Sequence, residues 1–461
     1  MPLLTTYPPL QLDNALTPVS VNRVEINGAF RTRRSFLDPI FKPLVDHGPN
    51  STTTIGDVVD RINVASEKLA QLGVFQEDIR VSIAQALDSP HPTAESLNLT
   101  FGVQEKGLLV LSAGTSVGNT EGSAVTHLQL RNILGGAETL TLDASTGTRT
   151  RAAYQAALST PLPSHPTLRL SLEGQRSSVA KPWASHTENL TAGLLRLAWP
   201  TPALDKHALV LSTTHRQITS LAPSASPTLR AEAGDSLKTA LSHTFTRDRR
   251  SGPFPFLPER GYLLRTVSEL AGWGPLKGDV SFAKSEVELA AVTPLTTTGG
   301  ITVSGTFRAG ALLPLPFGYG LSGPAAPSRI SDRFQLGGPT DVRVFQLGGL
   351  GPHDGRDAVG GDVYAAGGVS VTAPLPRVGA ASPLRAQAFV SGGRLVALGK
   401  GGMAGAVGEM GRGWPSMAAG VGLVYAHPIG RFELNFGLPL VVRRGEEGRK
   451  GLQLGVGITF M

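Results

Sequence analysis

The 461-residue chain has no cysteine, no run of 18 or more apolar residues, and a charged fraction of only 17%. The absence of cysteine excludes disulfides and cysteine-based metal sites. The absence of a long apolar run argues against a transmembrane helix. Soluble globular proteins carry about a quarter charged residues. The shortfall of charge therefore indicates that much of the surface does not face water.

What is abundant fits a β-barrel. Glycine accounts for 56 residues and proline for 34. Within lipid, only helices and closed barrels satisfy every backbone polar group, so a barrel is the membrane structure that this composition allows. The net charge of +7 is modest for the length, and we interpret it as solvated loops and rims rather than as attraction to acidic partners.

The N-terminal part of the chain divides into a lead and a small domain. Residues 1–20 are proline-rich and aperiodic, which predicts a flexible lead without the basic and apolar segments of a secretory signal. Residues 21–106 alternate between strand and helix periods. Pro39 and Pro43 predict that the first helix is kinked or broken into two short pieces, and Gly73 is expected to end the second. The expected elements are a strand at 21–28, a helical region at 32–46, a helix at 55–72, and strands near 74–87 and 97–105.

From residue 107 onward the apolar period becomes two. Leu452 and Leu454 face one way, whereas Gln453 and Gly455 face the other, as in a barrel wall with lipid outside and a wet lumen inside. About sixteen such segments occur, each long enough for the ~9–11 residues of a transmembrane strand. They begin near residues 107, 123, 136, 149, 165, 185, 206, 236, 259, 277, 299, 362, 384, 416, 431 and 451. The sequence thus predicts a transmembrane β-barrel of about 16 antiparallel strands in residues 107–461, preceded by one β-α-α-β-β domain.

Two stretches interrupt the rhythm of the strands. Residues 219–235 predict a loop with a short helix, and residues 315–361 form a long Gly/Pro-rich connection. Loops of that length inside a compact fold are generally functional or disordered. A soluble double β-sandwich is the alternative fold, but its strands would be shorter and it would need two separate cores.

The sequence contains no convincing catalytic or metal site. Residues 114–118 read GTSVG and match the G-x-S-x-G nucleophile elbow, but an alternating segment follows instead of a helix, which indicates a hairpin turn. The ten histidines form no H-E-x-x-H or other close ligand pair. Residues 349–351 read GLG without a following G-K-[ST]. We therefore expect no enzyme, no metal, no cofactor and no nucleic-acid partner.

The long connection carries the most specific pattern. Residues 332–345 read DRFQLGGPTDVRVF, and residues 357–364 read DAVGGDVY. A surface loop with glycine turns is the simplest interpretation. The run also resembles the lumen loop of the BamA-type outer-membrane assembly superfamily, whose signature is V-R-G-F/Y. It is most similar to the mitochondrial branch, the central barrel subunit of the sorting and assembly machinery, where it reads R-F-x-L-G-G-P, then R-G-F, then G-x-D-x-x-G-G-D.

The resemblance implies that Arg343 reaches into the barrel lumen and holds the loop against the inner wall. Val344 stands where the family has glycine, and Ser391 replaces the carboxylate of the paired wall motif F-x-D-x-G. Arg343 is therefore expected either to hydrogen-bond Ser391 without a full ion pair or to pair with another lumen acid. The residues assigned are the loop motif Val342, Arg343, Val344 and Phe345; the loop support Arg333, Phe334, Gly337, Gly338, Pro339, Asp357, Gly360, Gly361 and Asp362; and the wall motif Phe389, Ser391 and Gly393.

Two further features extend the resemblance over residues 21–461. The N-terminal domain resembles a single polypeptide-transport-associated (POTRA) domain, and one copy is the number in the mitochondrial branch. The last strand fits the mitochondrial β-signal, polar-x-Gly-x-x-hydrophobic-x-hydrophobic, as Gln453, Gly455, Ile458 and Phe460. The resemblance implies a lateral gate between this strand and the first one, with strand 1 contributing Leu108, Leu109, Val110, Leu111, Ser112 and Ala113. Glycine in both strands weakens such a seam.

The implied function is an insertase that folds β-barrel precursor proteins into the mitochondrial outer membrane. Its expected partners are the β-signals of precursor clients, accessory subunits of the sorting and assembly machinery on the cytosolic side, and outer-membrane lipids. The POTRA-like domain would then face the intermembrane space. The alternatives are a bacterial-type assembly or secretion transporter of the same superfamily, and a passive outer-membrane pore.

Overall fold

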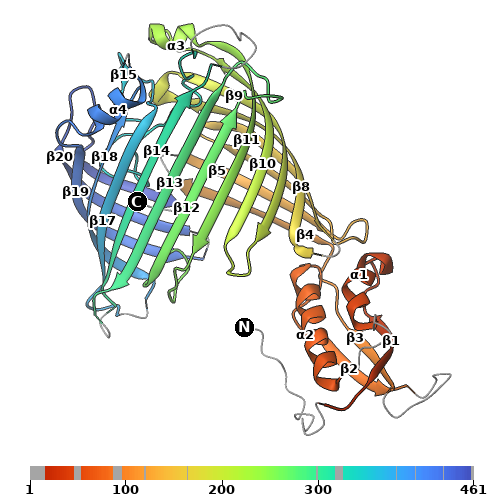
Figure 1. The fold of residues 1–461 in the computed structure, drawn as a ribbon. Coiled ribbons are helices and arrows are strands. Elements are labelled where there is room, and N and C mark those ends of the chain that lie inside the picture. The colour runs from red at the N-terminus through yellow and green to blue at the C-terminus, as the bar shows by residue number, and fades with distance from the viewer. Residues whose placement is uncertain are drawn as a thin grey trace.

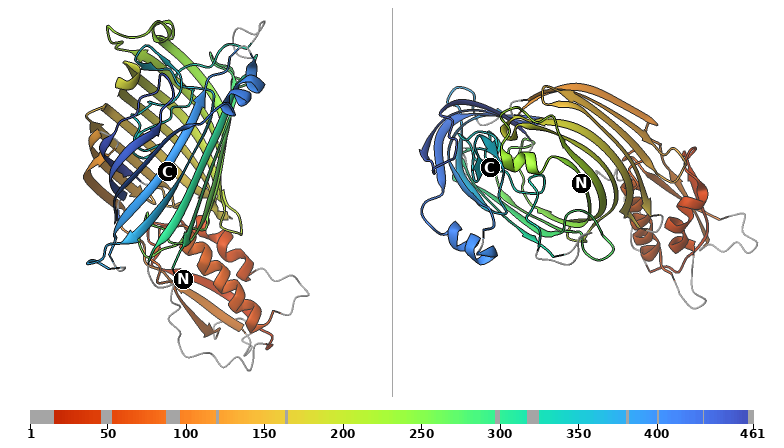
Figure 2. Two further views of the ribbon diagram at one scale, coloured as in Figure 1. Left: turned by 90° about the vertical axis from the view of Figure 1, so that its left-hand side faces the viewer. Right: turned by 90° about the horizontal axis from the view of Figure 1, so that it is seen from above.

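The computed structural model describes residues 16–45, 53–86, 96–118, 121–162, 165–296, 300–316, 325–379, 382–399, 401–428 and 430–457. It consists of a small N-terminal α/β unit and a sixteen-stranded antiparallel sheet that curls into a barrel (Figure 1). Seen from above, the small unit projects from one side of the barrel and does not cover its centre (Figure 2). Within the described ranges, no helix is long and apolar enough to cross a membrane.

The N-terminal unit has the β-α-α-β-β order predicted from the sequence. Its elements are β1 (Ser20–Asn27), α1 (Arg34–Val45), α2 (Ile55–Gln71), β2 (Arg80–Gln85) and β3 (Ser96–Gly102). Strand β3 lies between the other two strands, parallel to β1 and antiparallel to β2. The helices pack against this sheet around a core that includes Leu37, Leu69, Leu99 and Phe101.

Helix α1 is one continuous helix and not two short pieces, although Pro39 and Pro43 lie inside it. Five of its apolar side chains are buried in the core of the unit. Burying each one stabilises the helix by roughly 1.5–3 kcal/mol, and an interior proline costs about 3 kcal/mol. Packing therefore outweighs the two prolines. Helix α2 begins at a capping box formed by Thr54 and Asp57 and is followed by Gly73 at φ +77°, as expected.

The sixteen strands of the barrel follow one another in sequence order, and each is antiparallel to its neighbours. This arrangement confirms the predicted barrel of about 16 strands. The strands are β4 (Leu109–Gly118), β5 (Glu121–Arg131), β6 (Thr139–Gly147), β7 (Thr150–Leu162), β8 (His165–Lys181), β9 (His186–Pro200), β10 (Lys206–Thr219), β11 (Gly234–Asp248), β12 (Gly261–Ala271), β13 (Phe282–Pro294), β14 (Thr302–Pro314), β17 (Val363–Pro374), β18 (Leu384–Val396), β19 (Ser416–His427), β20 (Gly430–Val441) and β21 (Gly451–Gly457).

Short helices and a two-stranded ribbon lie in the connections. They are η2 (Pro182–Ala184), α3 (Pro227–Ala231), β15 (His353–Asp354), β16 (Asp357–Ala358) and α4 (Gly402–Met410). Helix α3 lies in the stretch 219–235, where a loop with a short helix was expected. The G-x-S-x-G match at residues 114–118 is not a hairpin turn but the end of strand β4, which pairs with β5 directly afterwards.

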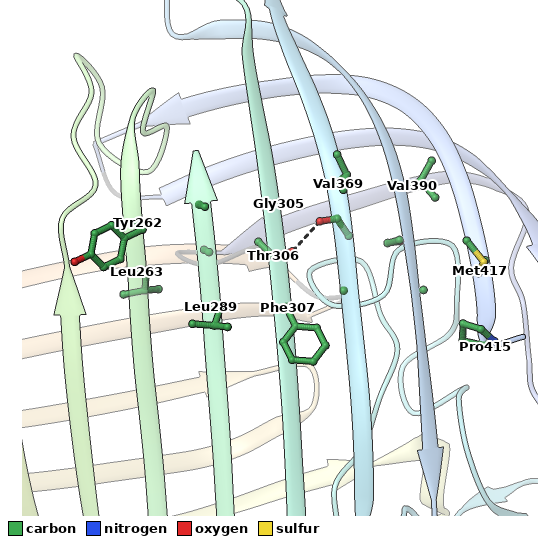
Figure 3. Close-up of a pocket in the computed structure, with 16 residues that line it drawn as sticks. Tyr262, Leu263, Leu289, Gly305, Thr306, Phe307, Val369, Val390, Pro415 and Met417 are labelled. Atoms are coloured by element: carbon green, nitrogen blue, oxygen red, sulfur yellow. Dashed lines mark hydrogen bonds between the residues drawn. The ribbon is translucent and has the colours of Figure 1, made fainter. Parts of the chain in front are cut away.

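The outer face of the wall is apolar. Along β20, Leu434, Phe436, Leu438 and Leu440 are exposed on the outside, because every second residue of a strand faces the same way. Figure 3 shows another part of this outer surface, across β12 to β19, where Leu289, Phe307, Val369 and Val390 line an apolar depression of 720 Å³. An apolar outer band around a more polar interior is the wall expected of a barrel in lipid.

The N-terminal unit is fastened to the barrel through the β5–β6 connection. The Arg33 backbone N–H donates to the Gly135 carbonyl oxygen at 2.8 Å, and Asn132 Nδ2 donates to Thr32 Oγ1 at 2.8 Å. From β8, Arg169 donates to two carbonyl oxygens at the end of α2. Burial raises the pKa of the nearby Glu105 carboxyl, but hydrogen bonds donated by Thr32 and Arg31 outweigh it and leave the pKa below its usual value. The division into domains at residues 106 and 107 stays a prediction.

Candidate functional site

Residues 325–361, here called the lumen loop, fold into the barrel and pack against its inner wall. Phe334, Leu336, Phe345 and Leu350 of the loop are buried together with inward-facing residues from several strands, including β11, β14, β17, β18 and β19. These buried contacts hold the central part of the lumen loop, from Phe334 to Leu350, against the inner wall. We take the loop and the seam between β4 and β21 as the candidate site.

Arg343 makes the central contact between the loop and the wall. Its Nε and Nη2 donate to Glu433 Oε2 and Oε1 on β20, at 2.8 and 3.0 Å. The side chains are 1% and 0% exposed, so this is a buried, two-pronged ion pair. The Arg343 guanidinium also lies over the Phe389 ring of β18, 5.0 Å from its centroid. Of the two partners considered from the sequence, the structure therefore has another lumen acid rather than Ser391.

A polar network completes the surroundings of Glu433. Gln387 Nε2 on β18 donates to Glu433 Oε2 at 3.1 Å, and Asn435 Nδ2 donates to the same oxygen at 2.8 Å. Arg431 forms a second ion pair with Glu433 at 2.6 Å. Removing one partner of a buried ion pair costs up to about 3–5 kcal/mol when the other charge is left without compensation; here Arg431 also compensates the Glu433 charge. Arg343 and Glu433 together are therefore a strong point of attachment for the loop.

Val344, at the position where the resemblance implies glycine, forms a turn with a positive φ. Its φ is +73°, in the left-handed region that a β-branched residue rarely adopts. The wall makes room for its side chain at Gly437 of β20, where a Cβ atom would lie only 2.2 Å from Val344 Cγ2. The loop tip thus tolerates valine because the facing wall residue has no side chain.

The loop tip is also joined to the last hairpin of the barrel. The Val344 backbone N–H donates to Gln453 Oε1 at 2.8 Å, and Gln453 Nε2 donates to the Phe345 carbonyl oxygen at 3.3 Å. In the β20–β21 connection, the Arg449 N–H donates to the Val344 carbonyl oxygen at 2.7 Å, and Glu447 exchanges backbone hydrogen bonds with the loop. Gln453 is the polar residue of the proposed β-signal, so the final strand is tied to the loop from inside.

A second attachment lies nearer the start of the loop. Arg216 of β10 donates to both oxygens of Asp332, at 2.7 and 2.9 Å, and both side chains are buried. Lys238 of β11 lies 3.4 Å from the same carboxylate. Phe334 stacks at an angle against Tyr364 of β17, with ring centroids 4.7 Å apart. The loop is therefore held on two sides of the lumen.

The remaining loop-support residues lie in and beside the folded loop. Asp362 is buried and accepts a hydrogen bond from the Ser328 hydroxyl. Arg333 Nε donates to the same hydroxyl oxygen. Asp357 accepts a hydrogen bond from the Ser226 N–H at 2.7 Å, next to α3. Positive φ values occur at Gly337, Gly338 and Gly360; Gly361 packs against Leu395, and Pro339 lines a cavity beside the seam.

The predicted wall motif lies on β18 and faces the loop. Phe389 contacts Arg343, and a Cβ at Gly393 would meet Leu336 and Val342 of the loop within 3.3 Å. The Ser391 hydroxyl is buried and has no hydrogen-bond partner among the described residues. The wall therefore receives the loop through an aromatic ring and a glycine, whereas the charge partner stands two strands away on β20.

The seam is formed by the first and last strands, which lie next to each other. Among the described residues, no ladder connects β4 with β21, and the sixteen-stranded sheet ends at these two strands. Leu109, Leu111 and Leu454 are exposed on the outer face, whereas Gln453 and Gly455 are buried inside. The proposed gate residues of strand 1 are Leu108, directly before β4, and Leu109, Val110, Leu111, Ser112 and Ala113 within it. Ile458 and Phe460 lie outside the described residues.

Sequence reasoning missed Glu433, Gln387, Arg216 and the role of Asp332. A signal for Glu433 was present, since it is a carboxylate on the polar face of a strand whose other face is continuously apolar. The described residues contain no cluster of three or more histidine, aspartate or glutamate side chains that could hold a metal. The candidate site thus consists of the anchored lumen loop and of the edges of β4 and β21, which no ladder joins among the described residues.

Comparison with known proteins gives close relatives over nearly the whole length. The Omp85 superfamily domain matches residues 132–460. A SAM50-like protein of Schizosaccharomyces pombe is 36% identical over 451 residues, which cover 97% of this chain and 92% of that protein. The sorting and assembly machinery component 50 homolog of Homo sapiens is 34% identical over 416 residues, covering 88% of this chain and 84% of that protein.

Solved structures share the fold at low sequence identity. BamA from Haemophilus ducreyi lacking POTRA domains 1–3 matches with a TM-score of 0.72 and 15% identity, covering 95% of this chain and 85% of that chain. CdiB from Acinetobacter baumannii matches with a TM-score of 0.53 and 12% identity, covering 95% and 73%. The solved structures show the fold, and the superfamily match and the sequence relatives show that the chain belongs to the Omp85 superfamily as a homologue of sorting and assembly machinery component 50, a family of non-enzymatic assembly proteins.

Proposed function

We propose that the protein folds β-barrel precursor proteins and inserts them into the mitochondrial outer membrane through the seam between β4 and β21. The observation that carries the proposal is the seam itself. Within the described part of the chain, β4 and β21 face each other without a ladder. Unpaired N–H and C=O groups at a strand edge template the addition of another strand. A client strand can therefore gain backbone hydrogen bonds there without any covalent chemistry.

The relatives support a proposal for the partners and the location. The relative from Homo sapiens is named as a homolog of sorting and assembly machinery component 50, and the relative from Schizosaccharomyces pombe is named as SAM50-like. We propose that accessory subunits bind this chain on the cytosolic side, that its barrel contacts outer-membrane lipids, and that the N-terminal unit faces the intermembrane space. Clients would approach the seam from the side on which that unit projects (Figure 2).

The lumen loop supports this function over a passive pore. An open pore requires a water-filled path, but residues 325–361 pack apolar side chains against the inner wall and bury an ion pair there. A secretion transporter, the bacterial-type alternative, would have to move the loop out of the lumen. That movement would break both the Arg343–Glu433 and the Arg216–Asp332 ion pairs. Lateral opening leaves most of these contacts in place.

Within this proposal, the loop motif holds the last strand in register from inside. The two hydrogen bonds of Gln453 to the loop backbone place the polar residue of the terminal strand at a defined depth. The outward leucines of β4 and β21 would then meet lipid or client on the opposite face of the seam. Gln453 and Gly455 act as the inward half of the gate, and residues 108–113 act as the edge that receives the client strand.

Disulfide locking of the seam tests the proposal, and the chain has no native cysteine to interfere. Directly opposed residues of an antiparallel pair have Cβ atoms ~4.5–5.5 Å apart, close enough for a disulfide after small adjustment. Cysteines scanned at Leu109 and Leu111 against Leu452 and Leu454 place both thiols on the outer face. The matched control combines Leu111→Cys with Gln453→Cys, which face opposite sides and should not crosslink.

The expected result is that a few register-specific pairs form, and that each locked barrel loses client insertion until the disulfide is reduced. A cysteine in the terminal strand of a client should crosslink to β4 instead. Normal insertion by a fully locked barrel would contradict the lateral route and return attention to the lumen or the outer wall.

A further inference from the structure

The connection between β11 and β12 is longer than a simple turn and folds as a small hairpin. Ser251 pairs with Arg260, and Phe254 pairs with Leu257, each through an isolated antiparallel bridge. The Ser251 N–H donates to the Arg260 carbonyl oxygen at 2.9 Å, and the Glu259 N–H donates to the Ser251 carbonyl oxygen at 2.9 Å. Phe256 completes the tip with φ +58°. Residues 251–260 are thus an ordered extension of two neighbouring strands.

The hairpin lies at the end of the barrel that meets the N-terminal unit. Connections on one end of an up-and-down barrel alternate with those on the other. The β5–β6 connection contacts the N-terminal unit, so the β11–β12, β17–β18 and β19–β20 connections lie at the same end. The lumen loop and α3 enter from the opposite end (Figure 1).

The tip of the hairpin reaches the wall formed by β18 and β19. Leu257 is buried against Val424 and Ala426, inward-facing residues near the end of β19, and Phe254 packs at the edge of the same cluster. Val424 is 0% exposed and Leu257 is 4% exposed. Strands β13, β14 and β17 separate this part of the wall from β12, so the hairpin crosses the lumen instead of following the wall.

Arg385 of β18 fastens the hairpin from the far wall. Its guanidinium lies over the Phe254 ring, 5.8 Å from the centroid, and 3.7 Å from Glu259. The same side chain donates to the Ser382 carbonyl oxygen at 2.5 Å and is 2% exposed. An apolar contact and a buried cation therefore hold the same few residues across the mouth of the barrel.

A cavity of 740 Å³ lies between the hairpin and the loop anchor. The hairpin, including Phe254 and Phe256, lines one side of it; Arg343 lines the other; and Ser304 and Ser370 lie on the barrel wall between them. The hairpin thus lies between part of this inner cavity and the end of the barrel at which the N-terminal unit projects. The unit itself lies to one side and leaves that end uncovered (Figure 2).

We propose that residues 251–260 form a lumen clasp that closes this mouth of the barrel to polypeptides and other large solutes. The clasp and the lumen loop narrow the interior from opposite ends, and the cavity lies between them. A polypeptide approaching from the side of the N-terminal unit therefore meets a closed lumen and has the seam as its remaining way into the membrane. The closure does not depend on the insertase function, and its test needs no client.

The experiment measures access to a single cysteine in the cavity. Ser304→Cys is made in the cysteine-free full-length chain, which is then placed in lipid nanodiscs and treated with a small maleimide or with a maleimide on a polyethylene glycol chain. In a second background, residues 252–259 are replaced by Asn-Gly, whose type I′ turn joins two strands directly. Phe30→Cys, at an N-terminal position that is 92% exposed, serves as the matched control in both backgrounds.

The bulky reagent is expected to label Ser304→Cys roughly tenfold or more faster once the clasp is shortened, because access then no longer requires local opening of the hairpin. The control cysteine should react equally in both backgrounds. Leu257→Asp should give the same acceleration, while Leu257→Met, which keeps an apolar side chain of similar volume, should leave the mouth closed; the pair separates loss of the clasp from misfolding. Equal labelling of Ser304→Cys by the bulky reagent with and without the clasp would overturn the proposal.

Discussion

Replacing Gly437 by alanine tests how the lumen loop sits on the wall. A Cβ atom at this position would lie 2.2 Å from Val344 Cγ2 and 3.3 Å from the carbonyl oxygen of Ala419. Carbon atoms pack favourably at about 3.5–4.0 Å, so the isopropyl group would have to move by roughly 1 Å. Val344 is only 1% exposed and lies between the buried residues Arg343 and Phe345, which leaves it no free space. The added methyl group must therefore displace the loop tip.

The expected cost follows from the packing. Overfilling a packed core costs about 1–3 kcal/mol. Val344→Gly alone loses roughly 1.5–3 kcal/mol of apolar burial but relieves about 1–3 kcal/mol of strain from the positive φ, so the two effects nearly cancel. In the double variant the clash is gone. We therefore expect a coupling free energy of about 1–3 kcal/mol between Gly437 and Val344.

The assay compares unfolding rates in identical nanodiscs at a fixed temperature, because barrels of this size unfold irreversibly. Protease cleavage within residues 325–361 gives a second readout of loop displacement. Gly174→Ala is the control, since a Cβ there would meet no atom within 4 Å. Gly437→Ala should unfold faster and expose the loop, and Val344→Gly should restore both properties. An unchanged loss in the double variant would show that the clash with Val344 is not the cause.

Two other predictions concern the anchor and the N-terminal unit. Arg343→Ala should release the lumen loop and reduce client insertion, because it removes the two hydrogen bonds that tie the loop to Glu433. The cost should stay below the roughly 3–5 kcal/mol of an uncompensated buried charge, since Arg431 still pairs with Glu433. Loop proteolysis measures the release, Arg265→Ala on the partly exposed Arg265–Glu288 pair is the control, and wild-type protease resistance would contradict it. Deleting residues 1–105 should leave a folded barrel, since every barrel ladder begins after that point. The measurement is the heat-dependent gel shift of the folded barrel. Loss of the folded band would place the domain boundary elsewhere.

Much of the fold follows from local patterns in the sequence. Strand β21 is an example, because Leu452, Gln453, Leu454 and Gly455 alternate without interruption, and the structure places the leucines outside and the others inside. Side chains in a strand repeat every two residues, so this assignment needs no knowledge of any other strand. Helix α2 is similar, since its capping box lies within four residues of sequence. Helix α1 is the exception, because burial decided against the break that its prolines predicted.

The candidate site depended on contacts that no local pattern contains. Arg343 and Glu433 are 90 residues apart in sequence, and their meeting is set by the path of the loop and by which strand faces it. Ser391 lies at the family's wall position, but the guanidinium reaches past it to β20. The register of sixteen strands around the curled sheet fixes these distances, and register is a property of the whole sheet.

The sequence alone thus determined the class of the protein: a small mixed domain, about sixteen amphipathic strands, and a loop with an arginine at its tip. Only the tertiary structure decided that Val344 is tolerated because Gly437 faces it, that Gln453 ties the last strand to the loop, and that residues 251–260 turn into the lumen. The physical reason is one of range. Alternation, caps and turns are settled between near neighbours, whereas packing and ion pairing in the lumen depend on residues that only the curling of the whole sheet brings together.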